Sequence, residues 1–264
     1  ELMTSSLNDK VVIVTGSSSG IGAAVVRQLA EKGCNVVINF SRSQGPADSV
    51  AEECRSLGVK TLVVKANISD DADCKRLVSE TEKAFGRIDG LVNNAGTTKF
   101  VAHNDLDGLS GKDFLDIYQV NVVGAYQMIR AAAPILRDDE GGSVVNVSSI
   151  AGVMGTGSCI AYAASKGALN TMTLSLARTL GPEIRVNTVC PGFVQGDWLR
   201  NGMGAERYDA TKAHLEATNP LRRAGGPEHM AEAVVMFLEA GKHITGEFLL
   251  ADGGQHLGGA PLGI

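Results

Sequence analysis

The sequence has few aromatic residues and no long apolar run. Aromatic residues make up 5% of its 264 residues, whereas 44% are hydrophobic and glycine occurs 32 times. Glycine and small aliphatic residues suit closely packed layers of helices and strands better than a β-sandwich. No apolar run approaches the roughly 18 residues of a bilayer-spanning helix, so no membrane span is expected. The length allows one large domain or two small ones.

An excess of positive charge and a metal-binding pattern are also missing. The net charge is −5, acidic and basic residues are interspersed, and no basic stripe points to nucleic acid. The N-terminal ten residues lack a basic-then-apolar signal pattern. The five histidines show no ligand spacing, so no metal is expected. The five cysteines are widely spaced without a C-x-x-C pair, which indicates reduced thiols in a cytoplasmic protein. They are Cys34, Cys54, Cys74, Cys159 and Cys190.

Apolar runs and helical patterns alternate along the chain. Residues 11–14 are all β-branched, as expected of a strand that is covered on both faces. Such repeated strand–helix units predict an α/β fold: one doubly wound, Rossmann-type domain over 1–264 with about seven parallel strands and helices on both faces. The expected strands are 11–14, 35–39, 61–66, 90–93, 143–148, 184–190 and 248–251. The expected helices are 21–31, 46–57, a segment capped at 69–71 that ends at 85, 112–136, 158–180 and 227–240.

One stretch shows no clear pattern. Residues 195–221 follow the sixth strand and have neither strand nor helix periodicity. A loop of that length in a compact domain is usually a lid or a binding loop, so we expect a lid here.

A glycine-rich turn follows the first expected strand and leads into a helix. Its glycines allow the backbone to approach a pyrophosphate, and the helix offers free N–H groups and the positive end of its dipole. This context favours cofactor binding over a merely structural turn. The cofactor-binding residues expected here are Gly16, Ser18, Ser19, Gly20, Ile21 and Gly22.

The end of the second strand should meet the adenosine ribose. An acidic residue there would accept from a 2′-hydroxyl and repel a 2′-phosphate, but this sequence has none. Arg42 can pair with a phosphate and Ser41 can donate to it, which favours NADP over NAD. The alternative is that Arg42 is only a solvated loop residue. Asn67 and Ile68, after the third strand, are placed to bound the adenine.

Tyr162 and Lys166 lie four residues apart, on one face if the segment is helical. A free tyrosine has a pKa of about 10, and a cation beside its hydroxyl can lower that value toward the working range. Ser149 lies at the end of an apolar run and can return to the same place. An ordinary pair on a helix face remains the alternative.

Taken together, these residues resemble the short-chain dehydrogenase/reductase family over nearly the whole chain. The turn at 15–22 matches the family's T-G-x-x-x-G-x-G motif, and Ser149, Tyr162 and Lys166 match its Ser…Tyr-x-x-x-Lys set. Further matches are Asn93-Asn94-Ala95-Gly96 for the N-N-A-G motif, Asn121 for the catalytic asparagine and Pro191-Gly192 for the P-G motif.

The resemblance implies hydride transfer between a nicotinamide and a ketone or secondary alcohol. Tyr162 would give its proton to the carbonyl oxygen, Ser149 would position that oxygen, and Lys166 would lower the pKa of Tyr162 and bind the ribose. Asn121 would hold a water that links Lys166 to solvent. Cofactor contacts are also implied for Asn94, Ala95, Gly96, Pro191, Gly192 and Val194.

The sequence departs from the family at two places. Ser19 stands where some NADP-using members carry a basic residue, and Gln195-Gly196 stands where a threonine often meets the carboxamide. Thr188 and Val194 remain candidates for that contact.

The substrate pocket is expected to be mostly apolar, which favours a partly hydrophobic ketone. The expected lining residues are Thr97, Ser149, Val153, Met154, Phe193, Trp198 and Met203. Members that reduce 3-oxoacyl chains on an acidic carrier protein place a basic residue near Glu183, which disfavours that partner here. A polar substrate reached through Asp197, Arg200 or Asn201 stays open.

Two other classes stay open as well. A catalytically silent dinucleotide-binding regulator would be indicated by a broken Ser–Tyr–Lys set, which is complete here. Sugar-nucleotide epimerases carry a larger substrate domain than this chain allows. The helices at 112–136 and 158–180 are apolar on more than one face, and the family usually buries such faces in a homotetramer or homodimer.

Overall fold

The structure is a computed structural model that describes residues 5–137 and 141–258. Its centre is a parallel sheet of seven strands in the order β3-β2-β1-β4-β5-β6-β7. This confirms the doubly wound α/β fold expected from the sequence. The strands are β1 (Val11–Val14), β2 (Asn35–Phe40), β3 (Thr61–Lys65), β4 (Gly90–Asn93), β5 (Gly142–Val147), β6 (Ile184–Pro191) and β7 (Phe248–Ala251).

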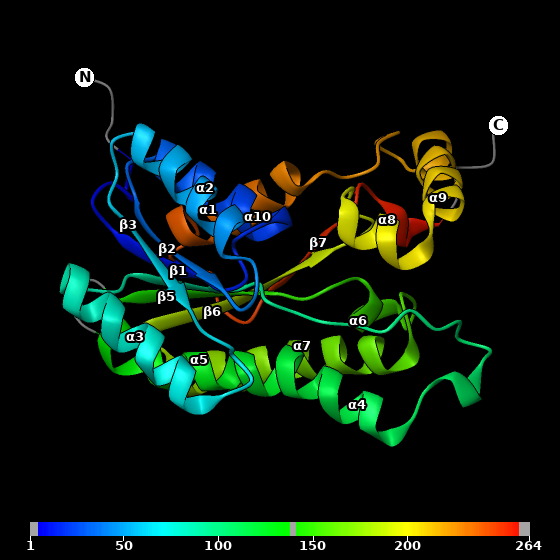
Figure 1. The fold of residues 1–264 in the computed structure, drawn as a ribbon, viewed down its shortest axis with the longest axis horizontal. Coiled ribbons are helices and arrows are strands. Elements are labelled where there is room, and N and C mark those ends of the chain that lie inside the picture. Colours follow the sequence, from blue (N-terminus) through cyan, green and yellow to red (C-terminus); the bar gives the residue numbers. More distant parts are fainter. Residues whose placement is uncertain (1–4, 138–140, 259–264) are drawn as a thin grey trace.

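Helices cover both faces of the sheet. One group lies above it in Figure 1 and consists of α1 (Gly20–Glu31), α2 (Gln44–Ser56) and α10 (Pro227–Glu239). The other group lies below and consists of α3 (Asp71–Phe85), α4 (Gly111–Tyr118), α5 (Ala125–Leu136) and α7 (Ile160–Leu180). Successive residues of β1 belong to the two opposite cores: Val12 and Val14 to one, Val11 and Ile13 to the other. A strand buried on both faces has no place for polar alternation, which explains its unbroken β-branched run.

Local signals set the helix ends where the sequence is explicit. The Asp70 side chain accepts from the backbone N–H groups of Ala72 and Asp73 and starts α3, while Gly86 at φ 72° ends it. None of the helices in the part of the chain that the structure describes combines the length and apolar character that crossing a bilayer requires.

The expected long helix at 112–136 is not one regular α-helix. Between α4 and α5 the chain forms a π-helical turn, Gln119–Gly124. Asn121 lies in this turn and bonds the backbone of Thr97, a contact between distant segments that helical periodicity does not show. π-Helical turns inside helices are frequent at functional sites.

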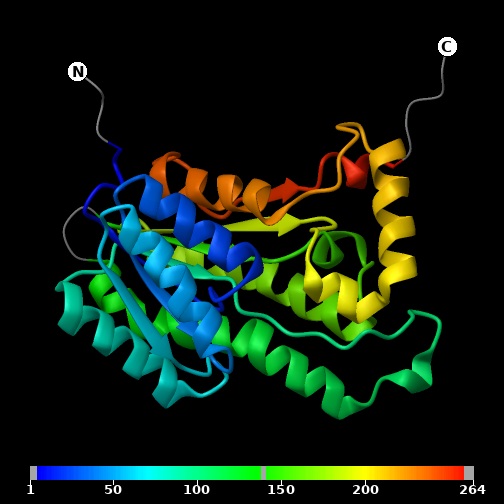
Figure 2. The ribbon, with the colours of Figure 1, turned by 45° about the horizontal axis from the view of Figure 1, so that its top comes forward.

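The expected loop at 195–221 is mostly helical, which corrects that prediction. It contains α8 (Asp197–Met203) and α9 (Ala205–Thr218), which Figure 2 shows at one end of the sheet, beyond β6. Only Tyr208 and Leu215 of α9 are buried. Because two buried residues in fourteen give almost no periodic signal, the sequence pattern missed this helix.

Candidate active site

The glycine-rich turn lies at the point where the strand order reverses, between β1 and β4. In doubly wound sheets ligands bind outside the carboxyl ends of the strands at this point. Gly16 has φ 61°, and an added Cβ would lie 2.9 Å from the Cα atom of Ala95. The Asn94 side chain donates to the carbonyl groups of Thr15 and Gly16 at 3.0 Å each. The turn and the segment after β4 are therefore held together as one unit.

The beginning of α1 offers free donors. Ser19, its N-cap residue, makes no side-chain capping bond, so it leaves the first N–H groups of the helix without that partner. Glycine at positions 16, 20 and 22 keeps side chains out of this region. Backbone donors, small residues and a helix N-terminus fit a dinucleotide pyrophosphate.

A cavity of about 1710 Å³ runs from this turn to Ser149, Tyr162 and Lys166. Nearly all of the expected cofactor-binding residues line it: Gly16, Ser18, Ser19, Gly20, Ile21, Ser41, Arg42, Asn67, Ile68, Asn94, Ala95, Gly96, Tyr162, Lys166, Pro191, Gly192 and Val194. Gly22 does not. It is buried behind the wall, where an added Cβ would lie 2.6 Å from Asn94 Nδ2 and 2.6 Å from the carbonyl oxygen of Gly16. Its role in the structure is to let α1 approach the turn.

The end of β2 carries the residues expected to read the ribose. Asn39 is buried and accepts from the Gly16 N–H at 3.0 Å, so its carboxamide supports the turn. Ser41 and Arg42 follow and line the cavity. Arg42 is exposed and makes no ion pair or side-chain hydrogen bond with any other described residue. Its guanidinium is therefore available to a ligand.

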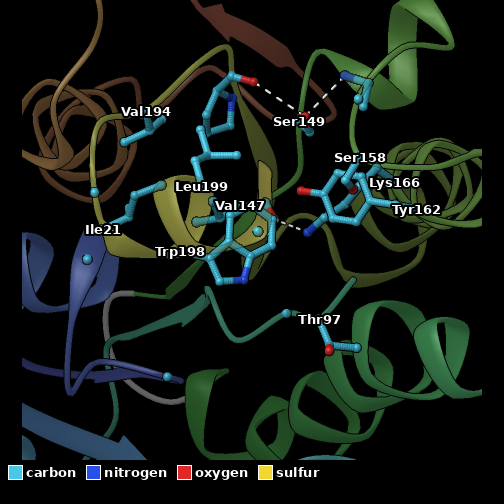
Figure 3. A pocket seen from close by; sticks show the side chains of 18 of the residues that line it. Ile21, Thr97, Val147, Ser149, Ser158, Tyr162, Lys166, Val194, Trp198 and Leu199 are labelled. Carbon is cyan, nitrogen blue, oxygen red and sulfur yellow. Dashed lines mark hydrogen bonds between the residues drawn. The ribbon is translucent and has the colours of Figure 1, made fainter. Parts of the chain in front are cut away.

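The catalytic candidates converge from two elements. Tyr162 and Lys166 come from α7, Ser149 follows β5, and all three line the cavity (Figure 3). Lys166 is 4% exposed, and its ammonium donates to the carbonyl of Val147 at 2.8 Å. The same ammonium lies 5.6 Å from the centre of the Tyr162 ring. The Ser149 hydroxyl accepts from the Ala151 N–H at 3.1 Å and donates to the Pro191 carbonyl at 3.5 Å.

Burial controls the protonation of this pair. It raises the pKa of Tyr162 to about 12 from an ordinary 10.0, although a hydrogen bond with the Ser149 hydroxyl offsets part of the rise. Burial also lowers the pKa of Lys166 to about 8 from 10.5, because an ammonium without water is disfavoured. The expected lowering of the Tyr162 pKa by Lys166 is absent in this geometry. The ammonium faces the ring and the Val147 carbonyl, and the loss of water at the hydroxyl is the largest cause of the shift.

Asn121 lies behind the cavity wall. It is 1% exposed, its Oδ1 accepts from the Thr97 N–H at 2.8 Å, and its Nδ2 donates to the Thr97 carbonyl and to the Ser165 hydroxyl at 3.0 Å each. A Cβ placed on Gly96 would lie 3.3 Å from Asn121 Oδ1 and 3.6 Å from Lys166 Nζ. Asn121 thus holds the segment after β4 beside Lys166.

The substrate end is only partly as expected. Thr97, Ser149, Phe193, Trp198 and Met203 line the cavity. Val153 and Met154 do not, which corrects that prediction. They lie on the short helix α6 (Ala151–Met154) and are 53% and 43% exposed. Thr188, considered for the carboxamide, is fully buried within β6.

Several residues of the site were missed by the sequence patterns. Phe100 and His103 line the cavity from the loop after β4, and Gln255 reaches it from beyond β7. The Gln255 Oε1 accepts from the Phe193 N–H at 3.3 Å. Gly152 was missed too. At this residue α6 approaches the backbone of α7 so closely that an added Cβ would lie 2.5 Å from the carbonyl carbon of Lys166. None of these four stands in a sequence motif that would single it out.

The chain is similar to many known proteins. A family model described as "Enoyl-(Acyl carrier protein) reductase" matches residues 16–256. A Streptomyces violaceoruber protein assigned as ketoacyl reductase 2 of the granaticin polyketide synthase is 43% identical, over 94% of this chain and 96% of its own. L-rhamnose 1-dehydrogenase (NAD(P)(+)) of a Sphingomonas species is 34% identical, over 95% of this chain and 98% of its own.

Solved structures with the same fold are also found. A crystal structure from Burkholderia xenovorans, assigned as a short-chain dehydrogenase/reductase, superposes with a TM-score of 0.87 at 41% identity and covers 94% of this chain and 98% of its own. Levodione reductase superposes with a TM-score of 0.88 at 26% identity, over 96% of this chain and 99% of its own. With the cavity geometry and the matched residues together, the chain belongs to the short-chain dehydrogenase/reductase family, whose members transfer hydride between NAD(P) and a ketone or alcohol.

Proposed function

We propose that this enzyme is an NADP-preferring reductase of a partly hydrophobic ketone, or the dehydrogenase of the corresponding alcohol, with Ser149, Tyr162 and Lys166 as catalytic residues. The observation that carries the proposal is that these three side chains and the glycine-rich turn line one cavity. When bound, the nicotinamide supplies or accepts the hydride. The protein orients the reactants and moves the proton.

Each catalytic side chain has a defined task in the reducing direction. Tyr162 carries its proton at neutral pH, and burial raises its pKa further, so it is available as the acid that protonates the carbonyl oxygen. The Ser149 hydroxyl donates to the same oxygen, where negative charge develops. Lys166 binds the ribose hydroxyls and, while protonated, stabilises the phenolate left behind. Since its pKa is lowered to about 8, reduction should slow as pH rises through that value.

The variant Tyr162→Phe tests the assignment. It removes the transferable proton and keeps the ring, so we expect kcat for ketone reduction to fall at least about 10²-fold while cofactor binding is retained. Tyr126→Phe is the matched control, because Tyr126 is an exposed tyrosine on α5 that does not line the cavity. Near-normal turnover by Tyr162→Phe would refute the proposed roles.

The NADP preference is carried by Arg42. An arginine at the ribose end that pairs with no other described residue, with no acidic residue at 41–43, supports binding of a 2′-phosphate. We expect Arg42→Ala to raise the KM for NADPH about tenfold or more and to change the KM for NADH little, whereas Arg137→Ala should change neither. An unchanged ratio of the two KM values would remove the basis for the preference.

A second candidate substrate is a 3-oxoacyl thioester. It is favoured by relatives named 3-oxoacyl-[acyl-carrier-protein] reductase, such as that of Staphylococcus epidermidis, which is 33% identical over 94% of this chain. It is opposed by the net charge of −5 and by Glu183, which is exposed where a carrier-protein partner needs a basic residue. Reduction of acetoacetyl-coenzyme A at rates above those for simple ketones would support it.

We also propose that the chain works as one domain whose lid is formed by α8 and α9.

The exposed apolar side chains of α4 and α5 concern the oligomeric state. They are Leu115, Tyr118 and Tyr126, which are 72%, 44% and 43% exposed, and they support burial of these helices in a homotetramer or homodimer. A monomer in sedimentation analysis would contradict this. The five cysteines are free and buried, which supports a reducing, cytoplasmic setting.

A further inference from the structure

Aromatic side chains gather at the substrate end of the cavity. The chain has 7 Phe, 4 Tyr and 1 Trp. Four of these twelve rings line this end: Phe100, Tyr162, Phe193 and Trp198. They come from four separate segments, namely the loop after β4, α7, the turn after β6, and α8. A chain so poor in aromatic residues does not bring four of them together by composition alone.

The single tryptophan lies beside the proposed proton donor. The ring centres of Trp198 and Tyr162 are 6.2 Å apart with planes inclined at 50°, and those of Trp198 and Phe100 are 5.7 Å apart at 63°. Figure 3 shows the indole next to Tyr162 at the centre of the site. Both separations fall within the range of favourable edge-to-face contacts. The proposed proton donor therefore has an aromatic wall on one side of it.

Phe100 packs closely against α8, the helix that carries Trp198. An added Cβ on Gly202 would lie 1.9 Å from Phe100 Cε2 and 2.1 Å from Cζ. The Phe100 ring thus lies directly against the backbone of α8, one turn along the helix from Trp198. The indole itself contacts Phe100 edge-on and is 51% exposed.

An indole that lines a cavity and is half exposed offers apolar surface to a ligand. Large aromatic side chains that line pockets in this way are typical anchors for binding. An aliphatic substrate would gain only the binding free energy of the apolar area that it buries here. An aromatic ring would add about 0.5–1.5 kcal/mol of binding free energy for each well-placed ring pair.

We propose that the substrate is a ketone or secondary alcohol that carries an aromatic ring near the reacting carbon, with this ring held against Trp198 and Phe100. This inference rests on the proposed ketone reduction and specifies its substrate class. In the reaction, hydride from NAD(P)H adds to the carbonyl carbon and the Tyr162 proton adds to the oxygen. The products are NAD(P)⁺ and the secondary alcohol, and solvent returns the proton to Tyr162.

The test uses two ketones that differ only in the aromaticity of the ring, 1-phenylpropan-2-one and 1-cyclohexylpropan-2-one. The methylene between ring and carbonyl keeps the reactivity of the two carbonyl groups similar. We expect kcat/KM of the wild-type enzyme to favour the phenyl ketone about tenfold. Trp198→Leu, which keeps an apolar side chain, should reduce this preference about 2–13-fold, the factor that 0.5–1.5 kcal/mol gives. Trp198→Phe should keep most of it.

The control variant is Phe85→Leu, because Phe85 ends α3, packs against a core cluster and does not line the cavity. It should leave the preference unchanged even if it lowers stability, because the preference is a ratio measured on one enzyme. Equal kcat/KM values for the two ketones, or a preference that Trp198→Leu leaves intact, would overturn the inference.

Fluorescence separates this inference from the proposed function. Because Trp198 is the only tryptophan, intrinsic emission reports on this one site. The phenyl ketone should change the emission of wild-type enzyme and of Tyr162→Phe at lower concentration than the cyclohexyl ketone does. Binding with this preference but without reduction would refute ketone reduction alone. Reduction of both ketones without preference in binding or turnover would refute the aromatic substrate alone, and an emission change with neither ketone would also count against it.

Discussion

Gly22 offers a sharp test of how the cofactor turn is built. In Gly22→Ala the new Cβ would lie 2.6 Å from Asn94 Nδ2, 2.6 Å from the Gly16 carbonyl oxygen and 2.8 Å from Ser17 Cα. Contacts this short require the turn or the Asn94 side chain to move. Asn94 now donates to Thr15 and Gly16, so its displacement costs both hydrogen bonds.

The opposing effects can be compared in size. Overpacking of a tight site costs about 1–3 kcal/mol, and two hydrogen bonds are worth about 0.5–1.5 kcal/mol each. Alanine is the better helix former by about 0.8–1.0 kcal/mol, and Gly22 lies inside α1. The losses exceed the gain, so Gly22→Ala should lower the free energy of unfolding by about 1–5 kcal/mol and weaken cofactor binding.

Urea unfolding and cofactor titration measure the two effects. Gly45→Ala is the control, because an added Cβ there meets nothing within 4 Å; it should be neutral or slightly stabilising. If the Asn94 contact is the cause, Gly22→Ala should cost less in an Asn94→Ala background than alone. A Gly22→Ala protein as stable as Gly45→Ala would show that our account of this turn is wrong.

Two further predictions follow from buried contacts. In Gly152→Ala the new Cβ would lie 2.5 Å from the Lys166 carbonyl carbon and 2.8 Å from its oxygen, and because backbone atoms cannot swing aside, Lys166 should be displaced and kcat should fall about tenfold or more. The control is Gly111→Ala, whose Cβ meets nothing within 4 Å and which should leave kcat unchanged. Steady-state kinetics measure kcat, and an unchanged kcat in Gly152→Ala would contradict the prediction. Burial raises the pKa of the Cys34 thiol to about 12 and that of Cys54, Cys74 and Cys190 to about 11. Above about pH 9 the unfolded chain therefore loses these thiol protons while the folded protein keeps them. The free energy of unfolding should fall as pH rises from 9 toward 11. Urea unfolding at pH 8 and pH 10 measures the fall, with Cys54→Ala expected to lessen it; equal stability at the two pH values would refute it.

The sequence by itself determined the fold and much of the site. The β-branched run of β1, the glycine turn after it and the regular alternation of strands and helices are local patterns, and each depends on neighbours only a few residues away. A parallel sheet then brings the carboxyl ends of its strands to one edge, so Ser149 and the glycine turn had to meet.

Tertiary structure alone decided which side chains complete the cavity. Val153 and Met154 turn outward on α6, while Phe100 and Gln255 arrive from distant segments that no spacing connects. The helix α9 was hidden for a related reason, since it buries too few residues to leave a periodic trace.

The protonation of Tyr162 and Lys166 was also beyond the sequence. Spacing placed Lys166 one turn from Tyr162 and suggested a lowered tyrosine pKa, yet burial raises it. Spacing along a helix fixes which residues are neighbours. The free energy of a charge depends instead on how much water the whole fold removes from it, and only the packed chain sets that quantity.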